Sequence, residues 1–250
     1  MSFKYKIDIP LDSFERTLLH KEIILSKPFL KNLYQEWYTT FNNELITLPP
    51  GKIVELGSGG GFLKELIPTV ISSDILPLPS NDMTFSALDM PFDNDSISGL
   101  FMVDTFHHLP DIYQFLSEAD RVLIKNGKII MIEPANSLWG RFIYKHFHHE
   151  PFNPKGKWQS PNSGPMSGAN GSLPWIVFVR DKQYFSKLFP ELLVNSIEYH
   201  TPFRYLLSGG VSFKQIVPNK SFAFFSKFDH WLTNLSSNIS MFMTIKLSKI

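Results

Sequence analysis

The fold of this chain is decided by one stretch, Ile53-Val54-Glu55-Leu56-Gly57-Ser58-Gly59-Gly60-Gly61-Phe62. It predicts a short apolar strand that holds a carboxylate near its end, then a glycine turn and the start of a helix. Glycines let the backbone adopt positive φ values, and without a Cβ they let a ligand lie against the main chain. A pyrophosphate-binding turn presents amide groups to an anion, which the acid at Glu55 disfavours. The stretch therefore predicts a cofactor that is cationic or rich in hydroxyl groups.

The spacing of the glycines separates two kinds of cofactor site. Gly57 and Gly59 match the first two positions of the dinucleotide fingerprint G-x-G-x-x-G, but Phe62 stands where its third glycine belongs. A nicotinamide-dependent oxidoreductase is therefore the weaker alternative. A plain strand-to-helix turn that binds nothing is the simplest one.

Length and composition exclude several classes of protein. The 250 residues, 43% hydrophobic and 19% charged, suit one α/β domain with a large core. The chain has no cysteine, which excludes disulfides, a thiolate nucleophile and zinc–thiolate sites and suits a reducing compartment. No signal-peptide pattern and no run of 18 apolar residues occurs, so we expect a cytoplasmic protein.

The charge is unevenly distributed towards the C-terminal end. Residues 201–250 hold six Lys or Arg against one acid, Asp229. A solvated face explains this most simply, and contact with an anionic substrate or a peripheral contact with a membrane surface is the sharper alternative. The cations are scattered rather than clustered, so nucleic acid binding is not expected. The sequence predicts no oligomeric state.

Strands and helices alternate after an N-terminal helical segment. Residues 13–46 show the helical period with an interruption at Pro28. Alternation of short apolar strands with helices predicts a Rossmann-like, doubly wound α/β fold with a mostly parallel sheet of seven strands. The expected strands are 52–56, 70–73, 84–87, 97–103, 128–132, 192–199 and 241–247, and the expected helices are 62–67, 112–122 with a stop at Gly127, 185–189 and 221–235.

Acidic residues recur where the predicted parallel strands end. Asp74, Asp89, Asp104 and Glu133 come at the ends of four successive strands. Ligands of such sheets bind beyond the carboxyl ends of the strands, although acids are also common in loops because they favour turns. We expect these four side chains to surround a ligand site.

A long segment with many prolines and glycines interrupts the alternation. Between Glu150 and Trp175 the chain holds five prolines and four glycines, which excludes a regular helix. Irregular segments of this length are usually functional lids or disordered. We expect an ordered loop that covers the site, with a flexible linker as the alternative.

Four motifs together resemble the class I S-adenosylmethionine-dependent methyltransferases, and most closely the type 11 group. The glycine turn, with its E-x-G-x-G-x-G pattern, is similar to motif I of that family. The other three motifs follow in the family's order and spacing within residues 50–135, and they are Ala87-Leu88-Asp89-Met90-Pro91-Phe92-Asp93-Asn94-Asp95-Ser96, Val103-Asp104-Thr105-Phe106-His107-His108-Leu109 and Arg121-Val122-Leu123-Ile124-Lys125-Asn126-Gly127-Lys128.

The resemblance implies S-adenosylmethionine as the cofactor and assigns roles to matched residues. Asp74 would accept hydrogen bonds from the two ribose hydroxyls, and Asp89 would accept one from the adenine amino group beside the backbone of Met90. Asp104 is added to the cofactor site by its position. The methionine part would lie against Glu55, Gly57, Ser58, Gly59 and Gly61.

The catalytic residues are open to several readings. His107 follows the fourth strand and is either a general base or part of the scaffold. His148, His149 and Glu150, beside the long loop, are equally suited to act on an acceptor. The run from His146 to Glu150 could also bind a metal, but no second ligand cluster has a recognisable spacing, so we predict no metal site.

The rest of the chain resembles a subgroup of bacterial methyltransferase-like proteins often associated with surface polysaccharide genes. That resemblance rests on the stretch from Trp139 to Trp175 and on residues 202–210. We therefore expect one domain over 1–250, made of a helical cap (1–48), a cofactor-binding half (49–135) and an acceptor-binding half (136–250) with its loop at 146–175. The expected activity is methyl transfer to a small or lipid-linked acceptor, a sugar hydroxyl or carboxylate, and the alternative is a non-catalytic partner of glycosyltransferases.

Overall fold

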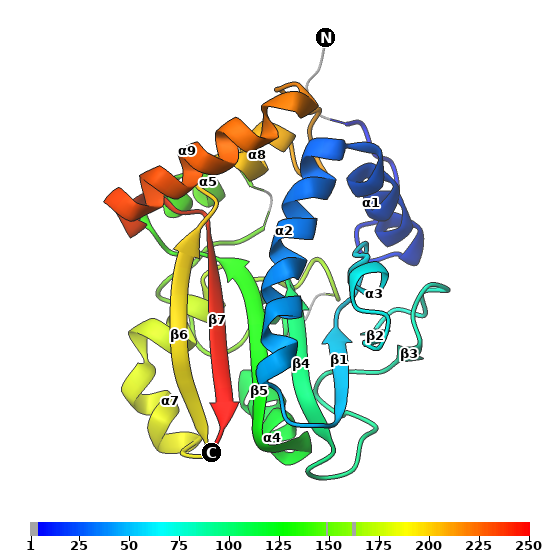
Figure 1. The fold of residues 1–250 in the computed structure, drawn as a ribbon, viewed down its shortest axis with the longest axis vertical. Helices are drawn as coiled ribbons and strands as arrows, with labels where there is room; N and C mark the ends of the chain where they lie inside the picture. The colour runs from blue at the N-terminus through cyan, green and yellow to red at the C-terminus, as the bar shows by residue number, and fades with distance from the viewer. Residues whose placement is uncertain (1–4, 149, 162–163) are drawn as a thin grey trace.

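One sheet forms the centre of the computed structural model, which describes residues 5–148, 150–161 and 164–250. Within these residues the sheet has seven strands in the order β3-β2-β1-β4-β5-β7-β6 (Figure 1). The first five pair in parallel, and β7 runs antiparallel to both of its neighbours. The predicted seven-stranded, mostly parallel α/β fold is confirmed. The strands are β1 Lys52–Leu56, β2 Ile71–Asp74, β3 Met83–Thr84, β4 Ile97–Val103, β5 Leu123–Pro134, β6 Leu192–His200 and β7 Phe242–Lys249.

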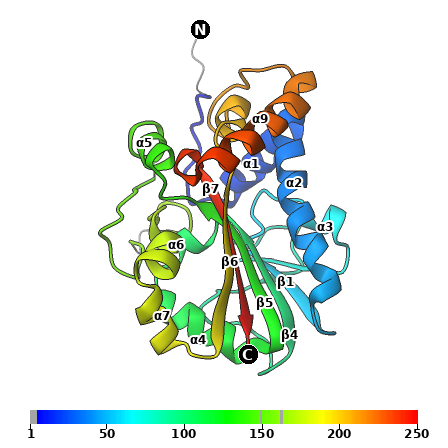
Figure 2. The same cartoon turned by 60° about the vertical axis from the view of Figure 1, so that its left-hand side comes forward.

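Helices cover both faces of the sheet and the carboxyl ends of its parallel strands. Figure 2 shows α2 and α3 on one face and α4, α6 and α7 on the other. In Figure 1, α1, α5, α8 and α9 lie beyond the ends of the parallel strands. The helices are α1 Phe14–Ser26, α2 Pro28–Glu44, α3 Leu63–Leu66, α4 Ile112–Val122, α5 Leu138–Phe147, α6 Leu173–Trp175, α7 Lys182–Leu188, α8 Arg204–Ser208 and α9 Phe222–Leu235.

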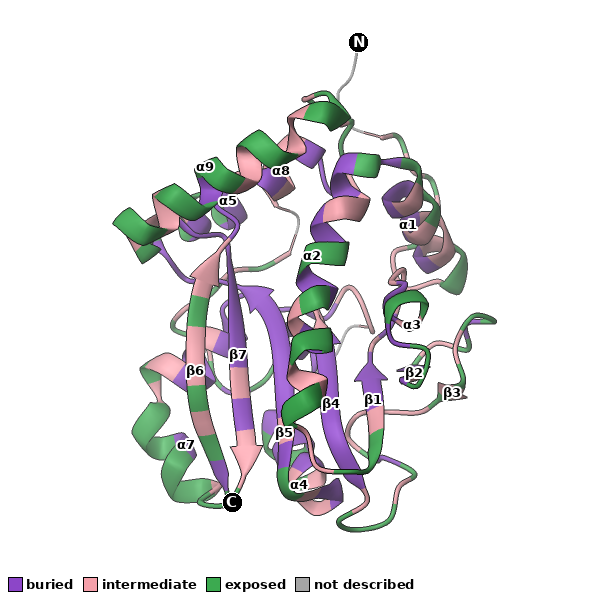
Figure 3. Ribbon diagram, in the orientation of Figure 1, coloured by how far each residue is buried: buried purple, intermediate pink, exposed green. Residues whose placement is uncertain are grey.

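Strand β4 shows how the sheet separates two hydrophobic cores. Side chains of a strand alternate between its faces, so Leu100 and Met102 join the core beneath α4 while Phe101 joins the core beneath α2. Phe41 of α2 stacks on Phe101 with ring centroids 4.8 Å apart. Figure 3 shows β4 and β5 buried along most of their length, whereas β6 at the sheet edge is partly exposed. The central strands therefore form a rigid base for the residues at their carboxyl ends.

The N-terminal helical segment divides where the sequence predicts. Helix α1 ends at Ser26 and α2 begins at Pro28, whose fixed φ suits the first turn of a helix. The buried residues of α2 recur at helical spacing, Leu30, Leu33, Trp37 and Phe41, and this face packs on the sheet.

The secondary structure departs from the predictions in several places. The third strand stops at Thr84 instead of Ala87, because the chain turns away and the Phe85 amide donates to the carbonyl of Asp74. Gly127 does not stop a helix: α4 ends at Val122, and Gly127 lies inside β5, beside Asn126 with φ of 65°. Helices α5 and α8 were not expected. In addition, Glu133 lies within β5 rather than after it.

Candidate functional site

A cavity of about 750 Å³ opens at the carboxyl ends of β1, β2 and β4. Its walls come from α1, α2, α5, the glycine turn, the proline- and glycine-rich loop and the segment after α8. Of the predicted site residues, Asp89 and Met90 do not line the cavity, and His149 lies outside the described residues. Those that do line it are Glu55, Gly57, Ser58, Gly59, Gly61, Asp74, Asp104, His107, His148 and Glu150.

The glycine turn can follow its path only because two of its positions lack a Cβ. Gly57 has φ of +65°, and a Cβ there would lie 2.5 Å from a carbon of the Thr105 side chain. A Cβ on Gly61 would lie 2.5 Å from the hydroxyl of Tyr38. That hydroxyl accepts a hydrogen bond from the Phe62 amide at 3.2 Å, which fixes the turn against α2.

Two carboxylates flank the turn. Glu55 is buried, and one of its oxygens accepts a hydrogen bond from the Ser58 hydroxyl at 2.8 Å. Burial raises the pKa of Glu55 to about 7, and the Ser58 hydrogen bond and the charge of Lys21 offset only part of the lost solvation. Asp74 accepts from the amides of Gly59 and Leu76, one on each oxygen and both at 2.9 Å. Each oxygen of Asp74 can still accept a further hydrogen bond from a ligand.

The cavity wall beside β3 corrects the position expected for adenine contacts. Asp89 is exposed, and the Met90 amide donates to Glu118 at 2.9 Å, so this backbone is bound to α4. Because β3 ends early, the residues that face the cavity come a few positions before Asp89. They are Phe85, Ser86, Ala87 and Leu88.

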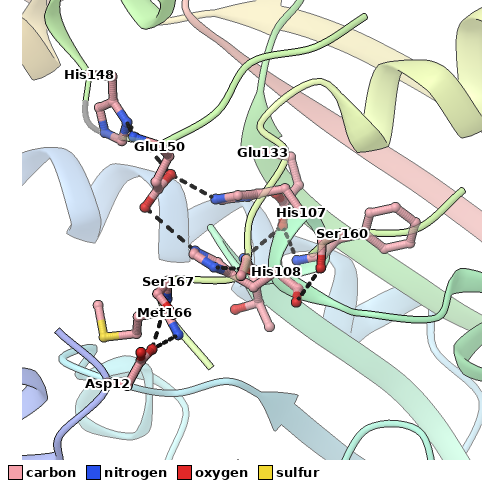
Figure 4. Close-up of polar contacts among 12 residues, drawn as sticks. Asp12, His107, His108, Glu133, His148, Glu150, Ser160, Met166 and Ser167 are labelled. Atoms are coloured by element: carbon pink, nitrogen blue, oxygen red, sulfur yellow. Dashed lines mark hydrogen bonds and ion pairs between the residues drawn. The ribbon is translucent and has the colours of Figure 1, made fainter. Parts of the chain in front are cut away.

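A buried histidine, His107, is held between two glutamates (Figure 4). One oxygen of Glu133 accepts from the amides of Thr105 and Phe106, and the other lies 2.6 Å from Nδ1 of His107. On the opposite side, Nε2 of His107 lies 3.3 Å from an oxygen of Glu150. Burial lowers the pKa of His107, but the two carboxylates outweigh burial and raise it well above its usual value. A protonated ring has no lone pair, which argues against His107 as a general base in this arrangement.

Three histidines surround the carboxylate of Glu150. Besides His107, Nε2 of His108 lies 3.7 Å from one of its oxygens, and Nδ1 of His148 lies 3.6 Å from the other. Burial opposes ionisation of Glu150, but His107 and the other histidines outweigh it and lower its pKa. Sequence analysis expected Glu133 to be one of four acids around a ligand site, but Glu133 does not line the cavity, and neither Glu133 nor His108 was given a binding or catalytic role.

Asp104 stands beside this cluster in a strained conformation. Its φ is 50°, which is uncommon for a residue with a side chain. Burial raises its pKa to about 8, while the nearby His107 acts in the opposite direction. Such a carboxyl group gains its proton readily and can donate a hydrogen bond into the cavity.

The proline- and glycine-rich segment is tied to the site at several points. The described residues between Glu150 and α6 form neither helix nor strand. The amide of Asn170 donates to the carbonyl of His107 at 3.0 Å, and the Ser160 hydroxyl donates to the carbonyl of His108 at 2.9 Å. Asp12 accepts from the amides of Met166 and Ser167, both at 2.8 Å. The loop therefore contacts both the histidines and the N-terminal segment.

Part of the chain is similar to a known family of domains. Residues 54–131 match the family model described as a methyltransferase domain. No curated protein matches the chain.

Several solved structures share the fold at low sequence identity. A protein from Haloferax volcanii, solved in complex with a methyltransferase activator, has 14% identity and a TM-score of 0.53, over 96% of this chain and 97% of that one. A S-adenosylmethionine-dependent methyltransferase from Thermotoga maritima, described as a possible histamine N-methyltransferase, has 18% identity and a TM-score of 0.51, over 95% of each chain. Geranyl diphosphate C-methyltransferase from Streptomyces coelicolor has 12% identity and a TM-score of 0.51, over 92% and 84%. The chain thus has the Rossmann-like fold of these methyltransferases.

Proposed function

We propose that this chain transfers the methyl group of S-adenosylmethionine to a small or lipid-linked acceptor, such as a sugar hydroxyl or a carboxylate. The observation that carries the proposal is the pair Glu55 and Asp74, which flank one glycine turn in a segment that matches a methyltransferase domain. The cofactor supplies an activated methyl group, so the main task of the chain is to hold the acceptor in line with it. The geranyl diphosphate enzyme of similar fold was solved with S-adenosyl-L-homocysteine, which supports this choice of cofactor.

The residues around the turn suit the groups of this cofactor. Glu55 would face the ammonium group of its methionine part, which would also relieve the cost of an ionised, buried carboxylate. Asp74 would accept from the two ribose hydroxyls. Ser86 and Ala87, rather than Asp89 and Met90, would contact the base. We treat residues 1–250 as one domain, in which 49–135 serve the cofactor and 136–250 the acceptor.

On the acceptor side, we assign His107 to positioning and the loop residues to the acceptor. His107 links Glu133, which is fixed on β5, to Glu150, which is on the loop. Glu150 and His148 line the cavity and would face the acceptor. His149 remains a candidate from the sequence alone. This division assigns binding of the acceptor to the part of the site that the glycine motif does not specify.

An isothermal titration with S-adenosylmethionine tests the cofactor assignment. Asp74→Ala should weaken binding by about 1.5 to 3 kcal/mol, roughly 10- to 150-fold, because two charge-assisted hydrogen bonds are lost. Asp89→Ala is the matched control, since Asp89 is an exposed acid outside the cavity. The affinity of this variant for S-adenosylmethionine should equal that of the wild type. Equal affinities of the wild type and Asp74→Ala would refute the ribose assignment. Tight binding of NADH instead would support an oxidoreductase.

An aromatic surface favours an acceptor that is presented at a membrane. We call this surface the aromatic face, and its rings form a chain of contacts from α5 to α9. Trp139 lies 5.3 Å from Phe203, Phe203 lies 6.5 Å from Phe228, and Phe228 lies 5.9 Å from Trp231, measured between ring centroids. Around them, large apolar side chains are exposed on both helices, namely Leu138, Phe142 and Phe147 of α5 and Phe224, Phe228, Trp231 and Leu235 of α9.

The two helices of the aromatic face, both fully described, expose no acid of their own, because Asp229 is buried against Arg204. The acid that contacts α9, Glu36 of α2, is also paired with Arg204. Of the six cations in residues 201–250, Arg204, Lys246 and Lys249 pair with acids. No ion pair forms at the other three, Lys214, Lys220 and Lys227, among the described residues. Aromatic side chains with unpaired cations suit the surface of an anionic bilayer.

Helix α5 connects this face to the cavity. Its Ile143, Tyr144 and Phe147 line the cavity, while Phe142 lies on the aromatic face. A lipid-linked acceptor could thus reach the cavity from a bilayer. Among the described helices, none is long and apolar enough to cross a membrane, so we propose a peripheral contact from the cytoplasmic side. An association with surface polysaccharide synthesis is a hypothesis about the same acceptor.

Co-sedimentation with vesicles tests the aromatic face. The chain should bind vesicles that contain phosphatidylserine and should bind phosphatidylcholine vesicles weakly. Replacing Phe224 and Trp231 with Ser should abolish binding, whereas Ile46→Ser, which changes an apolar residue exposed far from this face, should not. Equal binding by all three proteins would refute the membrane contact. A labelled-methyl assay with lipid-linked sugar precursors then tests turnover, and cofactor binding without turnover would favour the non-catalytic partner.

A further inference from the structure

Two adjacent histidines at the cavity each have one ring nitrogen fixed by an acceptor. Nδ1 of His107 lies 2.6 Å from Glu133, and Nδ1 of His108 lies 3.1 Å from the carbonyl of Gly168. A carboxylate and a carbonyl only accept, so Nδ1 donates in both rings. In a neutral ring the lone pair is then on Nε2. Both histidines therefore present the same atom, Nε2, for binding something else.

Both Nε2 atoms point toward the carboxylate of Glu150, as Figure 4 shows. They lie 3.3 Å and 3.7 Å from its two oxygens, one from each. The three ligand atoms of His107, His108 and Glu150 all lie within 4.8 Å of one another. The His107 and His108 rings come from consecutive residues of one short turn, with centroids 4.2 Å apart. The loop brings the third group from 43 positions away along the chain.

Two of these separations, which end on different oxygens of Glu150, are close to those between the ligands of a transition metal ion. A tetrahedral ion binds nitrogen and oxygen ligands at about 2.0 to 2.2 Å, which leaves neighbouring ligand atoms roughly 3.4 Å apart. The two nitrogen–oxygen distances at Glu150 are close to that value. Histidines that bind metals usually donate their other N–H to a carboxylate or a backbone carbonyl. Glu133 and Gly168 supply one of each.

We propose that His107, His108 and Glu150 form a binding site for a divalent transition metal ion such as Zn²⁺ in the wall of the cavity. Two imidazoles and one carboxylate favour ions of this class over Mg²⁺ and Ca²⁺, which prefer oxygen ligands. Three protein ligands leave at least one coordination position open, as in catalytic zinc sites. Because all three residues line the cavity, the open position faces the space for the acceptor.

The proposed site differs from the expectation that the chain binds no metal. That expectation was based on ligands close in sequence, His146 to Glu150, and on the lack of a second cluster. The second cluster is the pair His107 and His108, and only the fold brings it to Glu150. Metal binding is independent of the proposed methyl transfer. Its role toward the acceptor rests on that function, because an ion there would polarise an acceptor oxygen and favour loss of its proton.

The competing explanation is a cluster of ion pairs with a proton on His107. In that case a proton on Nε2 of His107 bridges to Glu150, and His108 contributes only packing. The two explanations differ in what His108 does. A metal site requires His108 as a ligand, whereas the ion-pair cluster does not.

Zinc binding by the tag-free chain, treated with a chelator, provides the test. Titration calorimetry should detect one equivalent of Zn²⁺, and Glu150→Gln and His108→Gln should each weaken binding at least about 10-fold. Glu133→Gln should weaken it by about 10- to 100-fold, since it removes the partner that orients His107. His146→Ala and His230→Ala, which change exposed histidines outside the cluster, should bind Zn²⁺ as the wild type does.

Two results would overturn the proposal. One is the absence of saturable Zn²⁺ binding by the wild type, and the other is unchanged affinity in both Glu150→Gln and His108→Gln. Circular dichroism during heating checks that each variant is folded, and a variant that has unfolded is replaced by His108→Asn or Glu150→Ala. S-adenosylmethionine affinity is measured on the same proteins, so failure of the proposed function and failure of the metal site are separate outcomes.

Discussion

The two sides of the cavity are built from contacts of very different range. On the cofactor side, Ser58 bonds Glu55 three residues away and Gly59 bonds Asp74 fifteen residues away. On the acceptor side, Trp139 donates to a carbonyl 63 residues away, and Arg204 pairs with Glu36 across 168 residues. The first side is therefore specified by a short motif. The second depends on the whole fold, so its chemistry can change without any change in the motif.

The two sides of the cavity also differ in how their buried charged groups are stabilised. The acceptor side pairs its own charges, as in His107 with Glu133 and Arg204 with Asp229. On the cofactor side, Glu55 is buried beside a hydroxyl group and raises its pKa instead. No ion pair forms at this carboxylate within the described part of the chain, which suits a ligand that brings a cation. This difference agrees with a ligand-binding role for the cofactor side and a fixed framework on the other.

Removing the central cation of the acceptor side should have the largest effect. Arg204 is 4% exposed and bonds Asp229, which is 1% exposed, as well as Glu36. Arg204→Met leaves the buried Asp229 with backbone amide donors but no cation, and it should lower the free energy of unfolding by about 3 to 5 kcal/mol. Urea denaturation measures this loss.

Two further variants sharpen that measurement. Adding Asp229→Leu to Arg204→Met should recover much of the stability, because it removes the unpaired charge. Glu36→Gln is the milder control, about 1 kcal/mol or less, since Glu36 is largely exposed. The affinity of folded Arg204→Met for S-adenosylmethionine should stay within about threefold if the two sides are independent. A tenfold loss of this affinity would show that the two sides of the cavity are not independent.

The accuracy of the predictions from the sequence also differs between the two sides of the cavity. Strands β1 and β4 and helix α4 begin and end where their apolar patterns predict, because each pattern is local and its face is buried. The roles of Asp89 and Met90 came from the family motif, and the strand before them ends three residues earlier than expected. A small error in a strand end is enough to move a side chain out of a site.

The residues that sequence analysis missed depend on distant partners. Helix α5 exposes Leu138, Phe142 and Phe147, so the apolar residues of its sequence do not all mark its buried face. Glu133 and His107 are 26 residues apart, and no local pattern indicates that they pair. Contacts of this range arise only when β4 and β5 lie side by side in the sheet.

The next largest effect should be a dependence of stability on pH at Glu55. Its pKa in the folded protein is about 7, against 4.5 for an unperturbed glutamate. A raised pKa favours folding below pH 4.5, and this contribution is lost as the pH rises through 7. Glu55→Gln cannot ionise, so its stability relative to the wild type should rise by about 3 kcal/mol between pH 4.5 and 8. Urea denaturation of both proteins at several pH values measures this difference in the free energy of unfolding. A difference that does not change with pH would show that burial does not raise the pKa of Glu55.

The smallest effects on the free energy of unfolding should come from substitutions at helix caps. The size of these effects should still differ between the two sides of the cavity. Asp111 caps α4 through a single bond, accepting from the Gln114 amide at 3.0 Å. Ser137 caps α5 by accepting from the Gly140 amide at 2.8 Å, and its hydroxyl also donates to the carbonyl of Ser240. Asp111→Ala should cost about 1 kcal/mol, and Ser137→Ala about 2 kcal/mol because the Ser240 carbonyl loses its donor in a buried place.

Thermal and urea unfolding of both cap variants, with Asp111→Asn as a variant that keeps its cap, measures this ordering. Asn caps a helix about as well as Asp, so Asp111→Asn should unfold close to the wild type. The two alanine substitutions should add within about 0.5 kcal/mol, since they share no partner. If Ser137→Ala cost no more than Asp111→Ala, the bond to Ser240 would contribute nothing. The long-range contact of α5 would then not make the acceptor side of the cavity differ from the cofactor side in stability.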